Sequence, residues 1–189
     1  MTVKEIYENI DIQKVMKVIA LNEISGNENV ICKFSFAGGI SGYSFGRSQF
    51  DVKHNEEARN FLRSRCGFTQ SEIDKLLRLD KNIAPLNEKL KVHRKEIDEF
   101  DADHVKKMIS HVASLEGLPT MDEKTFVHLV DYHNQFYLSR GGKMHKWLKS
   151  QKEVFSALIL EFKIKNLKWG KEQPGDVARR WENIEKAYK

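Results

Sequence analysis

One stretch, from Val30 to Val52, interrupts the helical pattern that runs through the rest of this chain. Outside it, apolar residues recur at spacings of three and four, and only three prolines occur in 189 residues. Aromatic residues are set among glycine and serine inside the stretch: Phe34, Phe36, Tyr43, Phe45 and Phe50. This composition favours short strands and hairpins. We therefore expect a mainly α (α+β) fold, a helical bundle with a small β-hairpin lobe near residues 30–52.

Length and composition indicate one globular domain. With 40% hydrophobic and 31% charged residues, the chain is long enough to bury one sizeable core. We expect a single domain over residues 1–189, with a small β lobe at about 27–54 and a larger helical lobe. No stretch approaches the roughly 18 apolar residues of a membrane span, and no apolar segment of a Sec signal is visible. We expect synthesis in the cytoplasm and no stable membrane insertion.

Capping residues predict where several helices begin and end. We expect Asp11 to open a helix that ends near Glu23, and Pro174 to open the terminal helix. Two segments have the form of capping boxes, namely Thr69–Glu72 and Thr120–Glu123. The second box predicts a helix running through Tyr137. Further helices are expected over 55–65, 86–100, 101–115 and, as a buried core helix, 154–160.

Charge and cysteine content restrict the partners and cofactors. The net charge of +5 favours an anionic partner, which can be nucleic acid, a membrane surface or a cell-wall polymer. The basic residues alternate with apolar positions, a pattern typical of solvated helix faces. Cys32 and Cys66 lack metal-binding spacing and are expected to be free thiols, and the seven histidines form no HExxH motif. We expect no metal and no cofactor.

Glu23 is the candidate acid of the chain. Cleavage of a glycosidic bond requires a carboxylic acid that stays protonated near neutral pH, which a protein obtains by placing Glu at an apolar, partly buried edge. Glu23 lies between the apolar run 18–21 and Ile24, whereas most other glutamates lie among lysines or acids. The alternative is a solvated glutamate in the last turn of a helix, where the helix dipole disfavours it slightly.

The loop that follows Glu23 offers polar groups for an opposite cleft wall. Ser44 and Asp51 are candidate catalytic residues beside Glu23, and Ser41, Tyr43 and Gln49 are candidate substrate-binding residues. A carboxylate separation of roughly 6.5–9.5 Å would let Asp51 activate water, whereas roughly 5–5.5 Å would suit a nucleophile. The alternative for Asp51 is a cap of the helix starting near Asn55. Ser44 either orients a water molecule or has only a structural role in the turn.

A second group of candidates lies in the segment 131–135, which reads Asp-Tyr-His-Asn-Gln. Asn134 and Gln135 lie beside an apolar helical stripe and would suit recognition of acetamido and hydroxyl groups. His133 falls inside the stripe, so it is either a substrate-binding residue or a core histidine with a satisfied ring nitrogen.

Glu23 followed by Ser-Gly-Tyr-Ser-Phe-Gly-Arg-Ser-Gln-Phe-Asp resembles the active-site region of lysozyme-like muramidases and phage endolysins. The segment Asp131–Gln135 is similar to their cleft-lining helix, and Asp-Val-Ala-Arg-Arg-Trp at 176–181 to their closing helix. The resemblance implies that Glu23 is the general acid and that the hairpin places water and binds the glycan. Asp51 lies 28 positions after Glu23, unlike the short spacing of the best-known phage lysozymes, so the second catalytic residue stays open.

The resemblance implies a monomeric glycoside hydrolase of bacterial peptidoglycan, acting on the cell wall or periplasm after release, as in phage lysis or effector export. A lytic transglycosylase using the same glutamate is the first alternative. Others are a basic helical nucleic-acid-binding module, with Trp147, Trp169 and Trp181 as stacking groups, and a structural protein of a phage or secretion particle. Under the leading hypothesis nucleic acid is not a partner.

Overall fold

The computed structural model describes all residues, 1–189, and contains eleven α-helices and one small antiparallel sheet. The expected mainly helical class with a small β-hairpin is therefore confirmed. The chain divides into two compact units. Unit 1 comprises Met1–Asn22 and His104–Lys189, and unit 2 comprises Glu23–Asp103.

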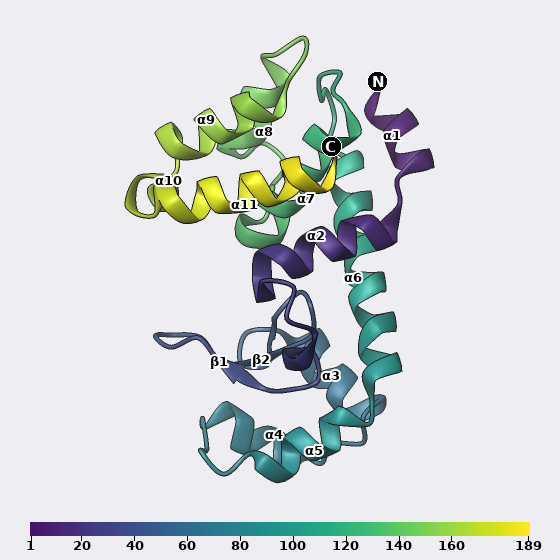
Figure 1. Cartoon of the computed structure of the whole chain (residues 1–189), viewed down its shortest axis with the longest axis vertical. Helices are drawn as coiled ribbons and strands as arrows, with labels where there is room; N and C mark the ends of the chain where they lie inside the picture. Colours follow the sequence, from purple (N-terminus) through teal and green to yellow (C-terminus); the bar gives the residue numbers. More distant parts are fainter. The chain divides into compact units, whose positions relative to one another are not determined.

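Unit 1 is built of helices, apart from an isolated β-bridge between Thr120 and Glu153, and its helices are labelled in Figure 1. It contains α1 (Val3–Asn9), most of α2 (Ile12–Ile24), the second half of α6 (Arg94–Ala113), α7 (Glu123–Phe136), α8 (Lys143–Lys149), α9 (Ser156–Asn166), α10 (Lys168–Glu172) and α11 (Pro174–Ala187). Helix α7 is the core of this unit, because every residue from Thr125 to Tyr132 is buried. It contacts α1, α9 and α11, so three helices pack against it.

Unit 2 combines the sheet with short helices. Its elements are the end of α2, the 3-10 helix η1 (Glu28–Val30), β1 (Ser35–Phe36), β2 (Tyr43–Phe45), β3 (Phe50–Asp51), α3 (Glu56–Ser64), α4 (Gln70–Leu77), α5 (Ala84–Lys91) and the first half of α6. The strands pair in the order β1-β2-β3, with Ser44 opposite both Ser35 and Asp51. Unit 2 thus continues well beyond the 27–54 segment that the sequence marks as the β lobe.

Phenylalanine side chains form the core of unit 2. The ring of Phe45 is fully buried and packs on Phe61 with centroids 5.9 Å apart, and Phe100 lies 4.4 Å from both Phe50 and Phe61. Phe34 contacts Phe45 and Phe68 edge-on. The aromatic residues of the hairpin therefore serve mainly to attach the sheet to α3 and α6.

Most of the expected helix starts are confirmed. The Asp11 carboxylate accepts from the Gln13 and Lys14 amides at the start of α2, and Thr69 and Glu72 form a complete capping box. Pro174 is the first residue of α11. The second expected box is wrong: Asp122 caps α7 by accepting from the Thr125 amide, while the Thr120 hydroxyl donates to the Lys152 carbonyl.

The expected boundary at residues 100–101 is also wrong, since α6 runs without a break from Arg94 to Ala113. Its buried residues keep helical spacing across that point, as Ile97, Asp101, Val105, Met108 and Val112 show. The break falls instead at Val92 and His93, between α5 and α6.

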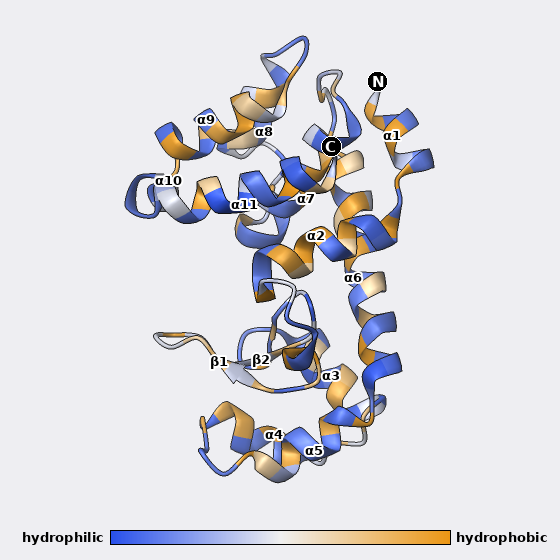
Figure 2. Ribbon diagram, viewed as in Figure 1, coloured by the Kyte–Doolittle hydropathy of each residue, from blue (hydrophilic) through white to orange (hydrophobic).

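Figure 2 shows orange and blue alternating along most helices, as expected for amphipathic helices with one buried face. None of the helices combines the length and the apolar character that a membrane crossing requires.

Candidate functional site

Glu23 lies in the last turn of α2 and is half-buried. Its neighbours Asn22 and Ile24 are buried, and the preceding turn buries Val18, Ile19 and Ala20. The chain then leaves the helix through Ser25 and Gly26, both with positive φ. Glu23 is thus flanked along its helix by buried residues, of which Asn22 is polar, while Leu21 is exposed.

The turn of α2 that carries Glu23 is held by hydrogen bonds at Asn22. The Asn22 carbonyl accepts from Arg179 Nη2 at 3.2 Å and from Arg180 Nη1 at 3.4 Å. The Asn22 side chain donates to Asp131 Oδ1 at 3.0 Å and accepts from Asn183 Nδ2 at 2.9 Å. Carbonyls in the last turn of a helix lack intrahelical partners, so these bonds satisfy one that would otherwise be orphaned.

Asp131 lies at the centre of this cluster and is fully buried. Its carboxylate accepts from Arg180 Nη2 at 2.6 Å and lies 3.6 Å from Lys163 Nζ. Burial acts to raise the pKa of Asp131, but the Arg180 and Lys163 cations outweigh it, so the pKa lies below its ordinary value. We call Asn22, Asp131, Lys163 and Arg180, which come from α2, α7, α9 and α11, the buried polar cluster.

The polar groups of the hairpin are engaged in bonds that shape the hairpin itself. The Ser35 hydroxyl donates to Gln49 Oε1 at 3.0 Å, and Gln49 Nε2 donates to the Gly46 carbonyl at 3.0 Å. The Ser41 hydroxyl donates to the Gly38 carbonyl, and the Tyr43 hydroxyl donates to the Asp80 carbonyl at 2.9 Å. Gln49 therefore sits in a preorganised turn, with a positive φ of 52°.

Both oxygens of Asp51 accept hydrogen bonds from the backbone. Oδ2 accepts from the Gly42 amide at 3.0 Å, while Oδ1 accepts from the Lys53 amide at 2.8 Å and the His54 amide at 3.2 Å. Asn55, and not Asp51, caps α3. The carboxylate thus closes the β1-β2 loop and the turn after β3, a structural role beside the expected catalytic one.

A second buried carboxylate, which the sequence analysis did not identify, fixes the turn between β2 and β3. Asp101 of α6 accepts from the Arg47 amide at 2.8 Å and the Ser48 amide at 2.9 Å. Burial raises the pKa of Asp101 above its ordinary value, although these bonds oppose the rise. The Arg47 side chain pairs with Asp98. A Cβ on Gly46, which has a φ of +78°, would lie 3.1 Å from the Asp101 carboxylate, so glycine is required there.

The expected substrate-binding residues of α7 lie in unit 1, whereas the hairpin residues and Glu23 lie in unit 2. The His133 ring stacks on His111 with centroids 4.3 Å apart, and its Nδ1 accepts from the Leu138 amide at 3.1 Å. Burial, with smaller contributions from His111 and His104, lowers the pKa of His133 to about 4. One ring nitrogen of His133 is therefore satisfied, but the residue is half-buried and does not belong to the core. Asn134 Oδ1 lies 3.4 Å from His104 Nε2, and Gln135 is half-buried.

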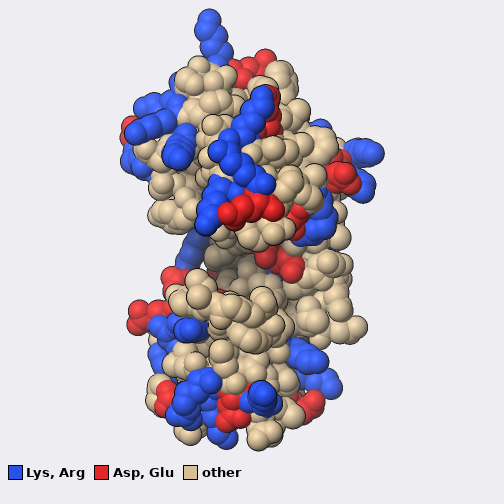
Figure 3. Space-filling view, turned by 90° about the vertical axis from the view of Figure 1, so that its left-hand side faces the viewer, with Lys and Arg blue, Asp and Glu red and all other residues tan.

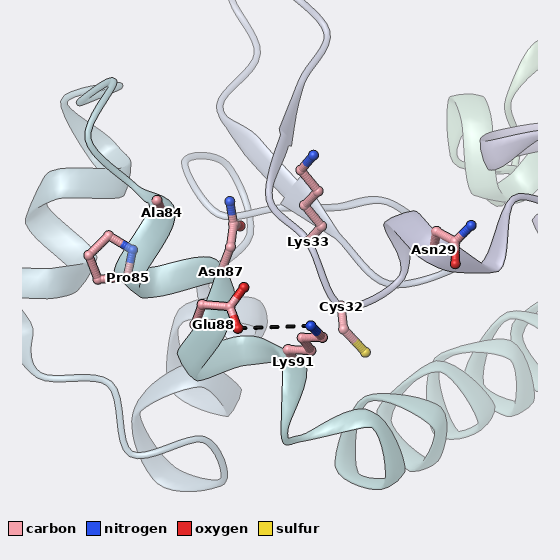
Figure 4. A pocket seen from close by; sticks show the side chains of 8 residues that line it. All are labelled: Asn29, Cys32, Lys33, Ala84, Pro85, Asn87, Glu88 and Lys91. Carbon is pink, nitrogen blue, oxygen red and sulfur yellow. Dashed lines mark ion pairs between the residues drawn. The ribbon is translucent and has the colours of Figure 1, made fainter.

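A cavity of about 570 Å³ in unit 2 involves none of the expected site residues (Figure 4). Its lining comprises Asn29, Cys32, Lys33, Ala84, Pro85, Asn87, Glu88 and Lys91. Asn87 is used structurally, since its Oδ1 accepts from the Phe34 amide. Cys32 and Cys66 are both free thiols, and burial raises the pKa of Cys66 to about 12. Neither thiol is activated as a nucleophile.

No group of three or more His, Cys, Asp or Glu side chains in the chain is placed to hold a metal ion. Comparisons of the chain with protein-family models, with curated proteins and with solved structures find no match. A functional proposal therefore depends on the residues and their contacts alone.

Proposed function

We propose that the protein is a lysozyme-like, peptidoglycan-degrading glycosidase in which Glu23 is the general acid. One observation supports this proposal above the others. The three segments that carry the resemblance to muramidases and endolysins are far apart in the sequence, yet Asn22, Asp131 and Arg180 contact one another in the buried polar cluster. This cluster fixes the turn of α2 on which Glu23 lies.

The chemistry proposed for Glu23 is protonation of the glycosidic oxygen. As the bond between that oxygen and the anomeric carbon breaks, the leaving sugar takes the proton and positive charge develops on the ring that remains. In a hydrolase, water then adds to the anomeric carbon and loses a proton to a carboxylate. Asp51 is the expected second carboxylate, and Ser44 lies opposite it across the β2-β3 pair.

The contacts of Asp51 favour the lytic transglycosylase as the second candidate. Its two oxygens already accept three backbone hydrogen bonds, so the carboxylate is engaged in holding the loop and the turn. A transglycosylase needs no second carboxylate, because Glu23, once deprotonated, accepts the proton of the sugar's own 6-hydroxyl. That hydroxyl then attacks the anomeric carbon and closes a 1,6-anhydro ring.

Turbidity loss of purified peptidoglycan tests the role of Glu23. We expect the wild-type chain to clear the suspension and Glu23→Gln to lose activity by a factor of 100 or more, on the order of the contribution of general acid catalysis. Glu56→Gln is the matched control, because Glu56 is exposed in the first turn of α3 and forms no ion pair. Equal clearing by wild type and Glu23→Gln would contradict the proposal.

Mass analysis of the released fragments separates the two candidate reactions. Hydrolysis leaves reducing ends, whereas transglycosylation leaves 1,6-anhydro ends that are lighter by one water. Asp51→Asn provides the second arm. A hydrolase that uses Asp51 loses activity in this variant, whereas a transglycosylase retains it as long as the hairpin stays folded.

A further inference from the structure

Positive charge is concentrated in one part of unit 1. The segment from Arg140 to Lys171 contains nine lysines and arginines and only two acidic residues, Glu153 and Glu161. Because the whole chain carries a net charge of +5, the rest of the chain is slightly negative. Seven of these nine residues lie in three consecutive helices, α8, α9 and α10, and Arg140 and Lys152 lie in the loops before and after α8.

Seven lysines of this segment are exposed, and we call them the lysine surface: Lys143, Lys146, Lys149, Lys152, Lys165, Lys168 and Lys171. Only two of them form ion pairs, Lys165 with Glu161 and Lys168 with Glu172. Figure 3 looks onto the side of unit 1 that carries α10 and shows lysine and arginine side chains spread across it. The other five lysines form no ion pair, although Lys149 lies close enough to Glu116 to help lower the pKa of that carboxyl.

The helices that carry the lysine surface pack closely on one another. The rings of Trp147 in α8 and Phe162 in α9 pack with centroids 4.8 Å apart. At the corner between α9 and α10, a Cβ on Gly170 would meet the Lys163 carbonyl oxygen at 1.9 Å, so the two helices are in direct backbone contact. Most of the lysines are therefore carried by packed helices.

Two exposed aromatic side chains lie near these lysines in the chain, Phe155 just before α9 and Trp169 in α10. Phe155 is 55% exposed and Trp169 is 40% exposed. Phe155 occupies the N-cap of α9 but makes no capping hydrogen bond, so its ring contributes little to the helix start. Trp169 donates from Nε1 to Asp176 at 3.3 Å, which orients its ring. Exposed Trp and Phe beside lysines are typical of surfaces that contact a lipid interface.

The choice between lysine and arginine indicates whether the surface binds an anionic lipid bilayer or one specific phosphate group. All eight basic residues from Lys143 to Lys171 are lysines, and none is arginine. Arginine is the usual residue for bidentate recognition of phosphate in nucleic acids, whereas lysine acts as a mobile point charge. Mobile charges on a broad surface suit an anionic bilayer, whose attraction adds up over many headgroups.

We propose that the lysine surface, with Phe155 and Trp169, binds peripherally to bilayers rich in anionic lipids. The lysines lie at the level of the headgroup phosphates, and the two aromatic rings enter the interface between headgroups and acyl chains. No part of the chain crosses the bilayer in this mode. The interaction needs neither Glu23 nor a glycan, so it stands independently of the proposed glycosidase activity.

Co-sedimentation of the full chain with lipid vesicles tests this proposal. We expect binding to phosphatidylcholine vesicles that contain about 30% phosphatidylglycerol, and none to pure phosphatidylcholine, with binding lost at high salt. The variant K146Q/K152Q/K171Q removes three lysines without ion pairs. It should lower the partition coefficient about 100-fold, since each lysine near an anionic surface contributes about fivefold.

A matched variant, K75Q/K81Q/K95Q, removes the same charge from exposed lysines of unit 2 that form no ion pairs. It should lower the partition coefficient far less. Equal losses in the two variants would show that binding depends on the net charge of the protein and not on the lysine surface. Phe155→Ser should weaken binding while leaving α9 intact, because serine is a favoured N-cap residue.

Two further outcomes decide the assignment. Glu23→Gln should bind vesicles like the wild type, which separates this proposal from the enzymatic one. Lysine-dependent binding of a soluble duplex DNA without any binding to vesicles would assign the surface to nucleic acid and overturn the proposal. Binding to phosphatidylcholine as strong as to the anionic vesicles would contradict it as well.

Discussion

Asp131 neutralises two buried cations, and its removal should therefore be costly. Replacing it by asparagine keeps the shape of the side chain but leaves Arg180 and Lys163 buried without an anion. We expect Asp131→Asn to lower the free energy of unfolding by about 3–5 kcal/mol, as for other buried pairs that lose one partner. Urea unfolding followed by circular dichroism measures this change.

Glu116 provides the contrast for Asp131. It forms an ion pair of similar length with Arg140, at 2.8 Å, but the two side chains are 76% and 58% exposed. Glu116→Gln should leave the unfolding free energy nearly unchanged, because exposed pairs are screened by water. If both substitutions had the same small effect, the buried polar cluster would not be the stabilising element described above.

The members of the buried polar cluster share one feature of the sequence: they are polar residues at positions where the helical periodicity predicts apolar ones. Each polar residue occupies a position on the apolar stripe of its helix: Asn22 follows Val18 and Ile19, and Arg180 lies between Val177 and Ile184. A polar residue at such a position predicts a buried partner, but the partner lies 109 positions away for Asn22 and Asp131. The residues around Glu23 in the sequence mark it as a candidate acid. They do not reveal the contacts of the buried polar cluster that hold its turn of α2.

At the scale of the element, Gly170 fixes the packing of α10 on α9. An added methyl group would meet three backbone atoms, Lys163 O at 1.9 Å, Lys163 C at 2.6 Å and Ile164 Cα at 2.8 Å. Backbone atoms cannot rotate aside, so the helices must separate. We expect Gly170→Ala to destabilise the protein by about 1–3 kcal/mol, in the range of overpacked cores.

Gly175→Ala is the matched control for this prediction. Gly175 is the second residue of α11, and nothing lies within 4 Å of an added Cβ. Alanine there should be neutral or stabilising, since it has a higher helix propensity than glycine. Thermal unfolding of both variants measures the difference, and a Gly170→Ala variant as stable as Gly175→Ala would contradict the close packing of the two helices.

Local signals predict the starts of elements better than their continuity. Asp11, Thr69 and Pro174 mark helix starts correctly, because capping depends on residues within one turn. Thr120 predicts the start of α7 incorrectly, because Asp122, two residues later, is an equally good capping residue and occupies the N-cap position. The glycine and aromatic content of residues 30–52 predicts strands correctly, whereas the extent of unit 2 to Asp103 depends on contacts that no local pattern encodes.

At the scale of the whole molecule, unit 1 combines a strongly basic surface with a core that contains buried titratable groups. His128 is fully buried on α7, and its Nε2 lies 3.2 Å from Glu185 Oε1. Burial, reinforced by the nearby Lys163 cation, lowers the pKa of His128 to about 4, although Glu185 opposes the shift. His133 has a similar pKa of about 4, so two histidines of this unit are neutral in the folded protein.

These two histidines predict that the protein loses stability in mild acid. In the unfolded chain each binds a proton near pH 6.5, but in the folded chain only near pH 4, so acid favours the unfolded state across this window. The carboxylates whose pKa values are lowered by their partners reduce stability mainly at lower pH, whereas Asp101, whose pKa is raised, acts in the opposite direction. We expect His128 alone to contribute a loss of about 2 kcal/mol between pH 7 and pH 4.5.

Urea unfolding at several pH values measures this loss, with His128→Gln as the test variant, since glutamine can still donate to Glu185 but does not titrate. The variant should be less sensitive to acid than the wild type by about 2 kcal/mol over the same interval. His54→Gln, at an exposed position of unit 2, is the matched substitution at an exposed histidine. If the unfolding free energy of His128→Gln changed with pH in the same way as that of the wild type, His128 would be protonated in the folded protein. The prediction that it is buried in the neutral form would then be wrong.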